Sequence, residues 1–140
     1  TIQAAILNVK IDYFNETIDE RNKCAKYYLE NLKFLTEKNY KLPKIFEDKK
    51  SVWAQFSILA PTQNDRDNIV NHLKDNNINV AIFYPTPLHN QECFLNLENY
   101  FKPKLPITEE VCNTIFNLPC YGEIDTKELE YIVKVIKDFF

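Results

Sequence analysis

Glycine is almost absent from this chain. Its 140 residues contain a single one, Gly122. Phosphate-binding turns such as the P-loop and G-x-G-x-x-G need several positions without a Cβ, because backbone N–H groups must approach the phosphate closely. The chain therefore does not hold a nucleotide in a glycine-rich loop of its own.

An excess of positive charge is also missing. The 17 basic residues are interleaved with 20 acidic ones, and the formal net charge is −3, so no face is expected to follow a nucleic-acid backbone. Apolar runs are short, such as residues 80–83, and the first residues form neither a basic nor a long apolar leader. We expect a cytoplasmic protein that binds neither nucleic acid nor membrane.

The four cysteines show no C-x-x-C spacing. Without that spacing, neither a zinc site nor the disulfide framework of a small secreted domain is indicated, and we predict no metal site. Cys24 and Cys93 are expected to be reduced and to act as small apolar side chains, since free cysteine is usually buried. Cys112 and Cys120 have the same expectation but remain open to other uses.

Helical periodicity begins with the first residues. Ile2, Ile6 and Val9 recur at helical spacing with no N-cap before them, which leads us to expect that the chain is part of a longer protein. A break is expected at residues 15–17. Thr17 and Glu20 then have the spacing of a capping box, which predicts a second helix from residue 17 to about residue 34.

The rest of the chain predicts alternating strands and helices. Alternation of apolar side chains indicates strands over residues 51–60 and 78–84, and a short apolar run that Pro119 stops indicates a third over residues 114–118. Helices are indicated over residues 64–76 and 108–113, the latter capped by Thr108, and after a second capping box formed by Asp125 and Glu128. The predicted fold class is α+β, with a small three-stranded sheet covered by helices and a long N-terminal helical arm.

No complete active site follows from residue spacing. Only His72 and His89 could act as bases near neutral pH. His72 is expected on the solvent-exposed side of the helix over residues 64–76. His89 follows a predicted strand end, behind Pro85 and Pro87, where rigid loops serve both binding sites and purely structural roles. Spacing leaves these two alternatives open for His89 and for Tyr84.

Three blocks taken together resemble one family. QAAIL (residues 3–7), YPTPLH (84–89) and LPCYGEI (118–124) are similar to the C-terminal part of DegT/DnrJ/EryC1/StrS aminotransferases, and the similarity spans nearly the whole chain. The resemblance implies the small domain of a fold-type I, pyridoxal-phosphate-dependent enzyme. Such enzymes transfer an amino group, commonly from glutamate, to a keto sugar attached to a nucleotide. Residues 1–35 would be a helical arm from a large domain, and residues 36–140 the aminotransferase C-terminal domain.

The resemblance also assigns site residues. The Schiff-base lysine and the other cofactor ligands would lie in the large domain, so this chain has no expected catalytic or cofactor-binding residue and would be inactive alone. Tyr84 and His89 would contact the substrate, and Phe83 and Pro85 would shape the wall of its cleft. Family members often have histidine at the position of Phe83, and with phenylalanine there the resemblance implies no polar role for this residue. The complete protein would be a homodimer.

Two other functions remain open at this stage. One is a freestanding binding or interaction module that performs no chemistry. The other is a relative that uses pyridoxal phosphate for dehydration or that acts on a ketone other than a sugar.

Overall fold

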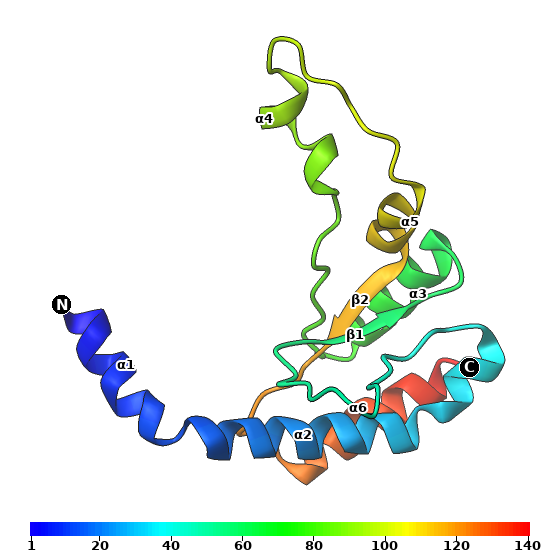
Figure 1. The fold of residues 1–140 in the computed structure, drawn as a ribbon. Coiled ribbons are helices and arrows are strands. Elements are labelled where there is room, and N and C mark those ends of the chain that lie inside the picture. Colours follow the sequence, from blue (N-terminus) through cyan, green and yellow to red (C-terminus); the bar gives the residue numbers. More distant parts are fainter.

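Two helices from opposite ends of the chain lie side by side and form much of the core. The computed structural model describes residues 1–140, in which α2 (Phe14–Asn31) packs along α6 (Thr126–Asp138) (Figure 1). The apolar stripe predicted for the last helix is buried: Leu129, Ile132, Val133, Val135 and Ile136. Its predicted capping box is confirmed, because the Asp125 carboxylate accepts from the Glu128 N–H (2.7 Å) and the Glu128 carboxylate accepts from the Asp125 N–H (3.1 Å).

The first two helices meet at a bend at Tyr13. Helix α1 (Ile2–Asp12) has an N-cap after all, since the Thr1 hydroxyl oxygen accepts from the Ala4 N–H (3.5 Å); the expectation of an uncapped start is wrong. The capping box predicted at Thr17 is wrong as well, because α2 already begins at Phe14. Inside that helix the Thr17 hydroxyl donates to the Tyr13 carbonyl oxygen (3.1 Å), the usual alternative for threonine within a helix.

The sheet contains two strands instead of the predicted three. Strand β1 (Phe56–Leu59) pairs antiparallel with β2 (Ile115–Leu118), and Phe56 lies opposite Leu118. Strand β1 is shorter than predicted because Trp53 adopts a φ of 47°, which is incompatible with an extended strand.

The segment over residues 78–84, predicted as the third strand, touches the sheet only through one bridge between Ala81 and Asn117. Beyond Ala81 the chain leaves the sheet, and Pro85 and Pro87 have no N–H with which to continue a ladder. The mixed α and β character of the prediction is therefore correct, but the number of strands is not.

The remaining elements surround this centre. They are η1 (Lys33–Lys38), α3 (Gln63–Asp75), η2 (Leu88–Asn90), α4 (Glu92–Leu95) and α5 (Pro106–Thr114). Thr108 is not a cap, because α5 begins two residues earlier with Pro106 in its first turn, where proline fits without losing a helical hydrogen bond. None of the helices is both long enough and apolar enough to cross a bilayer.

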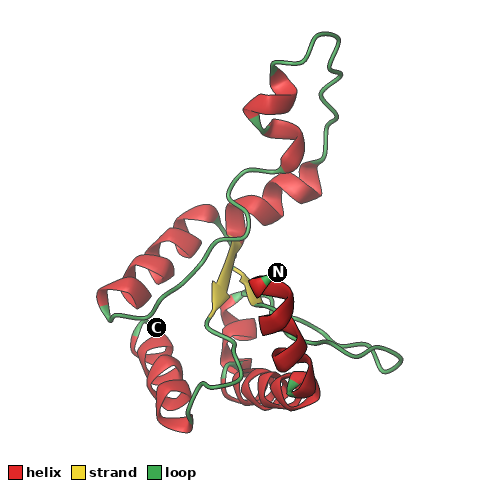
Figure 2. Cartoon of the chain, turned by 90° about the vertical axis from the view of Figure 1, so that its left-hand side faces the viewer, coloured by secondary structure: helices red, strands yellow, loops and turns green.

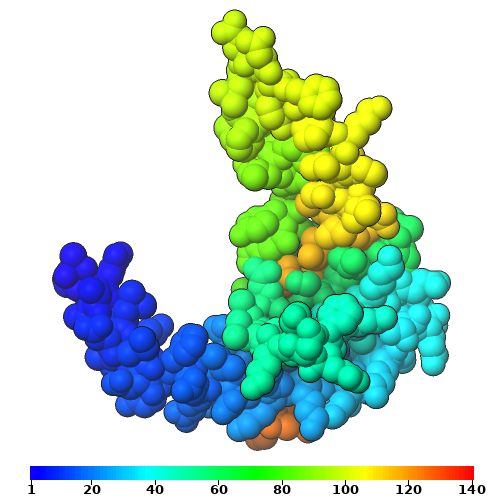
Figure 3. All heavy atoms as spheres, in the orientation of Figure 1, coloured from blue at the N-terminus to red at the C-terminus, as the bar shows by residue number.

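Two parts of the chain project from the core. Helix α1 extends from one side, and the segment over residues 84–105, which carries α4, extends far from the sheet (Figures 1 and 2). The space-filling view shows a broad hollow between them (Figure 3). Large apolar side chains are exposed on both projections: Ile2, Ile6, Leu7, Val9 and Ile11 on α1, and Leu88, Leu95, Leu97, Phe101 and Leu105 on the segment. Exposed apolar sets of this size are typical of surfaces that contact another polypeptide.

Asparagine occupies the backbone positions where glycine is usually found. Asn39, Asn77 and Asn99 have φ angles of 63°, 59° and 63°, and Gly122 is not in this region. Asparagine is one of the few residues that tolerate the left-handed conformation, because its short side chain can form local hydrogen bonds. The chain therefore makes its tight turns with hardly any glycine.

Candidate functional site

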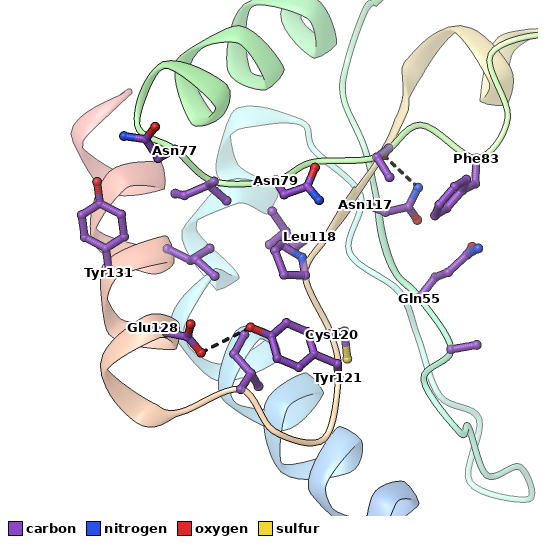
Figure 4. Close-up of a pocket in the computed structure, with 16 residues that line it drawn as sticks. Gln55, Asn77, Asn79, Phe83, Asn117, Leu118, Cys120, Tyr121, Glu128 and Tyr131 are labelled. Carbon is purple, nitrogen blue, oxygen red and sulfur yellow. Dashed lines mark hydrogen bonds between the residues drawn. The ribbon is translucent and has the colours of Figure 1, made fainter. Parts of the chain in front are cut away.

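A cavity of about 510 Å³ lies beside the end of β2 (Figure 4). Its walls come from residues 54–55, from the segment over residues 77–83, from residues 117–121, from Ile124 and from α6. The lining includes four carboxamides and three aromatic rings: Gln55, Asn77, Asn79, Asn117, Phe83, Tyr121 and Tyr131. Glu128 is the only charged residue in the lining. This chemistry suits a largely neutral, polar ligand that is held by hydrogen bonds and stacking.

Asn117 fixes the segment over residues 77–83 to the sheet. Its side chain is buried, and both its backbone N–H (2.8 Å) and its side-chain amide (3.1 Å) donate to the Ala81 carbonyl oxygen. Its side-chain oxygen accepts from the Ser57 hydroxyl (2.5 Å). These bonds place Phe83, two residues further on, in the cavity wall. Our sequence reasoning missed Asn117, although a polar residue in the apolar strand IFNL is a usable signal.

The four residues expected at the substrate site lie in different environments. Phe83 lines the cavity and is 40% exposed, and its ring centroid lies 5.7 Å from that of Tyr84. Tyr84 is 68% exposed and Pro85 is also exposed, and neither lines the cavity. The structure therefore brings Phe83 to the cavity and leaves the Tyr84 hydroxyl available to a ligand outside it.

His89 is separated from the cavity. Its ring is buried, with 7% exposed, and Nε2 lies 3.0 Å from Oε1 of Glu109 on α5. The Tyr100 hydroxyl donates to the His89 carbonyl oxygen (3.1 Å). One contact ties the projecting segment to α5, and the other joins two parts of the segment itself, so His89 helps to fix the shape of this segment.

The contact between His89 and Glu109 should make the free energy of unfolding depend on pH. The hydrogen bond from His89 lowers the pKa of the Glu109 carboxyl group. A carboxyl whose pKa is lower in the folded state stabilises the fold above its unfolded-state pKa of about 4.3, and this contribution is lost as the pH falls through the folded-state pKa. We expect Glu109→Gln to unfold at lower urea than the wild type near neutral pH, and the difference to shrink in acid.

The adjacent Glu110 provides the matched control, because its side chain makes no hydrogen bond or ion pair. Glu110→Gln should differ little from the wild type in its urea midpoint at any pH. Identical pH profiles for the two variants would contradict the role of the His89 contact.

His72 is not the solvated histidine that we predicted. Its Nε2 lies 3.0 Å from the Val135 carbonyl oxygen, and its ring centroid lies 5.2 Å from that of Phe139. The side chain therefore joins α3 to α6. The sequence could not show this, because the partners are more than 60 residues away.

The comparison with known proteins identifies the family. The model of the DegT/DnrJ/EryC1/StrS aminotransferase family matches residues 1–137. The chain belongs to this family, as its three sequence blocks indicated.

Individual relatives match over nearly the whole chain. A "pleiotropic regulatory protein" of Geobacillus stearothermophilus is 31% identical over 99% of this chain, and the dTDP-3-amino-3,6-dideoxy-alpha-D-galactopyranose transaminase of Aneurinibacillus thermoaerophilus is 28% identical over 99%. The crystal structure of a DegT DnrJ EryC1 StrS aminotransferase from Brucella abortus has a TM-score of 0.83 at 28% identity, and covers 99% of this chain. The chain spans only 36% of the length of each of the two curated relatives and 35% of the Brucella chain.

Enzymes of this family use pyridoxal phosphate, and the residues present here do not fit that cofactor by themselves. The cavity has no lysine that could form a Schiff base and no arginine or lysine for the phosphate group. The only charge in its lining is the carboxylate of Glu128, which would repel a phosphate. No step of a reaction can therefore be assigned to these residues acting on the cofactor.

Proposed function

We propose that the complete protein is a pyridoxal-phosphate-dependent aminotransferase for a nucleotide-linked keto sugar, and that this chain forms part of its substrate site. The match to the family over residues 1–137 carries this proposal, and the relative named as a dTDP-sugar transaminase supports the substrate class. The cofactor is then held by the part of the protein outside these residues. The isolated chain is accordingly expected to be inactive.

The role of this chain is to position the substrate. The exposed Tyr84 hydroxyl and the neighbouring Phe83 ring offer a hydrogen bond and a stacking surface on adjacent residues. Pro85 restricts the backbone of Tyr84, so little conformational freedom is lost when a ligand binds. Such groups accelerate a reaction by fixing the orientation of the substrate, while the cofactor supplies the electron sink.

For His89 we propose a structural role. Its buried ring and its Glu109 partner favour a role in holding the loop that contains Tyr84 and Pro85. Direct contact between His89 and the substrate stays a prediction.

The two projections support a larger assembly. We propose that residues 1–35 form an arm that leads into the cofactor domain, and that residues 36–140 form the small domain of a homodimeric enzyme with an amino-acid donor such as glutamate. The exposed apolar side chains of α1 and of the segment over residues 84–105 support this arrangement, because a second polypeptide surface would cover them.

The site assignment is tested by Tyr84→Phe in the complete protein. We expect kcat/KM for the nucleotide sugar to fall about tenfold, which corresponds to one hydrogen bond of roughly 1.4 kcal/mol. The visible absorbance of the bound cofactor should be unchanged, because this chain does not hold it. Steady-state kinetics with purified complete protein would measure both quantities.

Tyr13→Phe is the matched control, because Tyr13 is also an exposed tyrosine but lies at the bend between α1 and α2. It should retain wild-type kinetics, and wild-type kinetics for Tyr84→Phe would refute the site assignment. A panel of nucleotide-linked keto sugars with glutamate tests the function itself. Bound cofactor without amino transfer would favour dehydration or another ketone, and absence of bound cofactor would favour a non-catalytic module.

A further inference from the structure

Two of the four thiols meet behind the cavity wall. Cys120 lines the cavity (Figure 4), and Cys24 is fully buried on α2. Sγ of Cys24 lies 3.9 Å from the carbonyl oxygen of Pro119, the residue before Cys120, and Sγ of Cys120 lies 3.9 Å from the Arg21 carbonyl oxygen, one helical turn before Cys24. Each cysteine sulfur therefore contacts the backbone close to the other cysteine in the sequence. One sulfur thus faces the cavity and the other faces the core.

The surroundings make the two thiols different. The hydrogen bond from Cys24 and the positive charge of Arg21 lower the pKa of the Cys120 thiol, although burial opposes them. The hydrogen bond to Cys120 and burial raise the pKa of Cys24. Arg21 forms no ion pair, and its buried Nε has no hydrogen-bond partner, so no carboxylate neutralises it.

Two further titratable groups are close to the pair. The Tyr28 hydroxyl donates to the Pro119 carbonyl oxygen (2.9 Å), and burial raises the pKa of Tyr28. Tyr121 donates to the Glu128 carboxylate (3.3 Å). Both tyrosines are therefore neutral in the physiological range, and the Glu128 carboxylate is occupied by hydrogen bonds.

We propose that Cys120 is a peroxide-reactive thiol and that Cys24 is its resolving partner, so that oxidation ties the cavity wall to α2. The Cys120 thiolate attacks one oxygen of a hydroperoxide, the O–O bond breaks, and the second oxygen leaves as hydroxide or alkoxide, which takes up a proton. The Cys24 sulfur then attacks the Cys120 sulfenic acid. The S–O bond breaks and water leaves with the Cys24 proton, so that two thiols and one hydroperoxide give a disulfide, water and a water or alcohol.

The other cysteines lack this arrangement. Cys93 is exposed on α4, with only Gln91 near its sulfur (3.9 Å), and Cys112 lies half-buried on α5. Neither sulfur makes a hydrogen bond to a residue next to another cysteine. Accessibility alone would favour Cys93, whereas thiolate character together with a resolving partner favours Cys120.

The test is limited oxidation of the full-length protein with hydrogen peroxide, followed by alkylation of the remaining thiols and peptide mapping. We expect loss of the Cys24 and Cys120 thiols together, with a linkage between their peptides that dithiothreitol reverses. Cys24→Ser should abolish the linkage and leave a Cys120 sulfenic acid that dimedone traps. Cys93→Ser and Cys112→Ser should form the linkage at the wild-type rate.

The wild-type protein alone can refute the proposal, which matters because Cys24 is buried and its variant could be unstable. Oxidation of Cys93 ahead of Cys120, or retention of free Cys24 after Cys120 has reacted, would overturn it. The readout does not depend on aminotransferase activity, so its failure is separate from failure of the proposed function.

Discussion

Phe116→Ala is expected to lower the free energy of unfolding by about 3–5 kcal/mol, the range for truncation of a buried phenylalanine. Phe116 is 0% exposed and lies in β2 opposite Ile58. Removing its ring leaves a void between the sheet and the helices, because close-packed neighbours relax only in part. Urea denaturation of the wild type and the variant would measure the difference.

The chain offers a matched control for this substitution. Phe101 is 86% exposed on the projecting segment, so Phe101→Ala should change the free energy of unfolding by no more than about 0.5 kcal/mol. Similar losses for both variants would contradict the assignment of the core to the sheet and its covering helices.

Asn117→Asp is expected to destabilise the fold by about 3 kcal/mol or more near neutral pH, because it buries a charge and aims an acceptor at another acceptor. The Ala81 carbonyl oxygen, which now receives the side-chain amide at 3.1 Å, would face a carboxylate oxygen. Burial would raise the pKa of the new carboxyl above its unfolded value. The variant should therefore regain stability relative to the wild type as the pH falls and the carboxyl becomes protonated.

Asn79→Asp is the control for this second substitution. Asn79 also lines the cavity but is exposed, so its replacement should have little effect on the urea midpoint. Thermal or urea unfolding of both variants across acid and neutral pH would show whether only Asn117→Asp has the inverted pH dependence. A pH-independent loss would contradict the burial of the new charge.

Local signals in the sequence predicted several elements well. The capping box at Asp125, the apolar stripe of the last helix and the short strand over residues 115–118 depend on neighbours within a few residues, so the pattern contains the necessary information. The capping box at Thr17 failed although its signal is just as local, because the pattern is equally compatible with a helix interior and the bend at Tyr13 decides between them. The prediction of a third strand was wrong, because the segment over residues 78–84 is held to the sheet by a single bridge at Ala81 and forms no longer ladder.

The site was less predictable than the fold. Phe83 lines the cavity; its expected place in the wall of the substrate cleft came from resemblance to a family and stays a prediction. Contacts that join distant parts of the chain were invisible: His89 with Glu109, His72 with Val135, and Cys24 with the turn at Cys120. Each depends on packing, and residue spacing gives no information about it.

The pairing of α2 with α6 also constrains how the protein can form during synthesis. Strand β1 needs a partner that is about 60 residues away, and the core face of α2 is covered by a helix that is translated last of all the elements described. Contacts between distant residues are slow to form, because loop closure costs entropy before the contact stabilises anything. While the chain is still on the ribosome, the face of α2 that packs against α6 therefore stays uncovered until α6 emerges, and exposed apolar surface of this kind favours association of nascent chains.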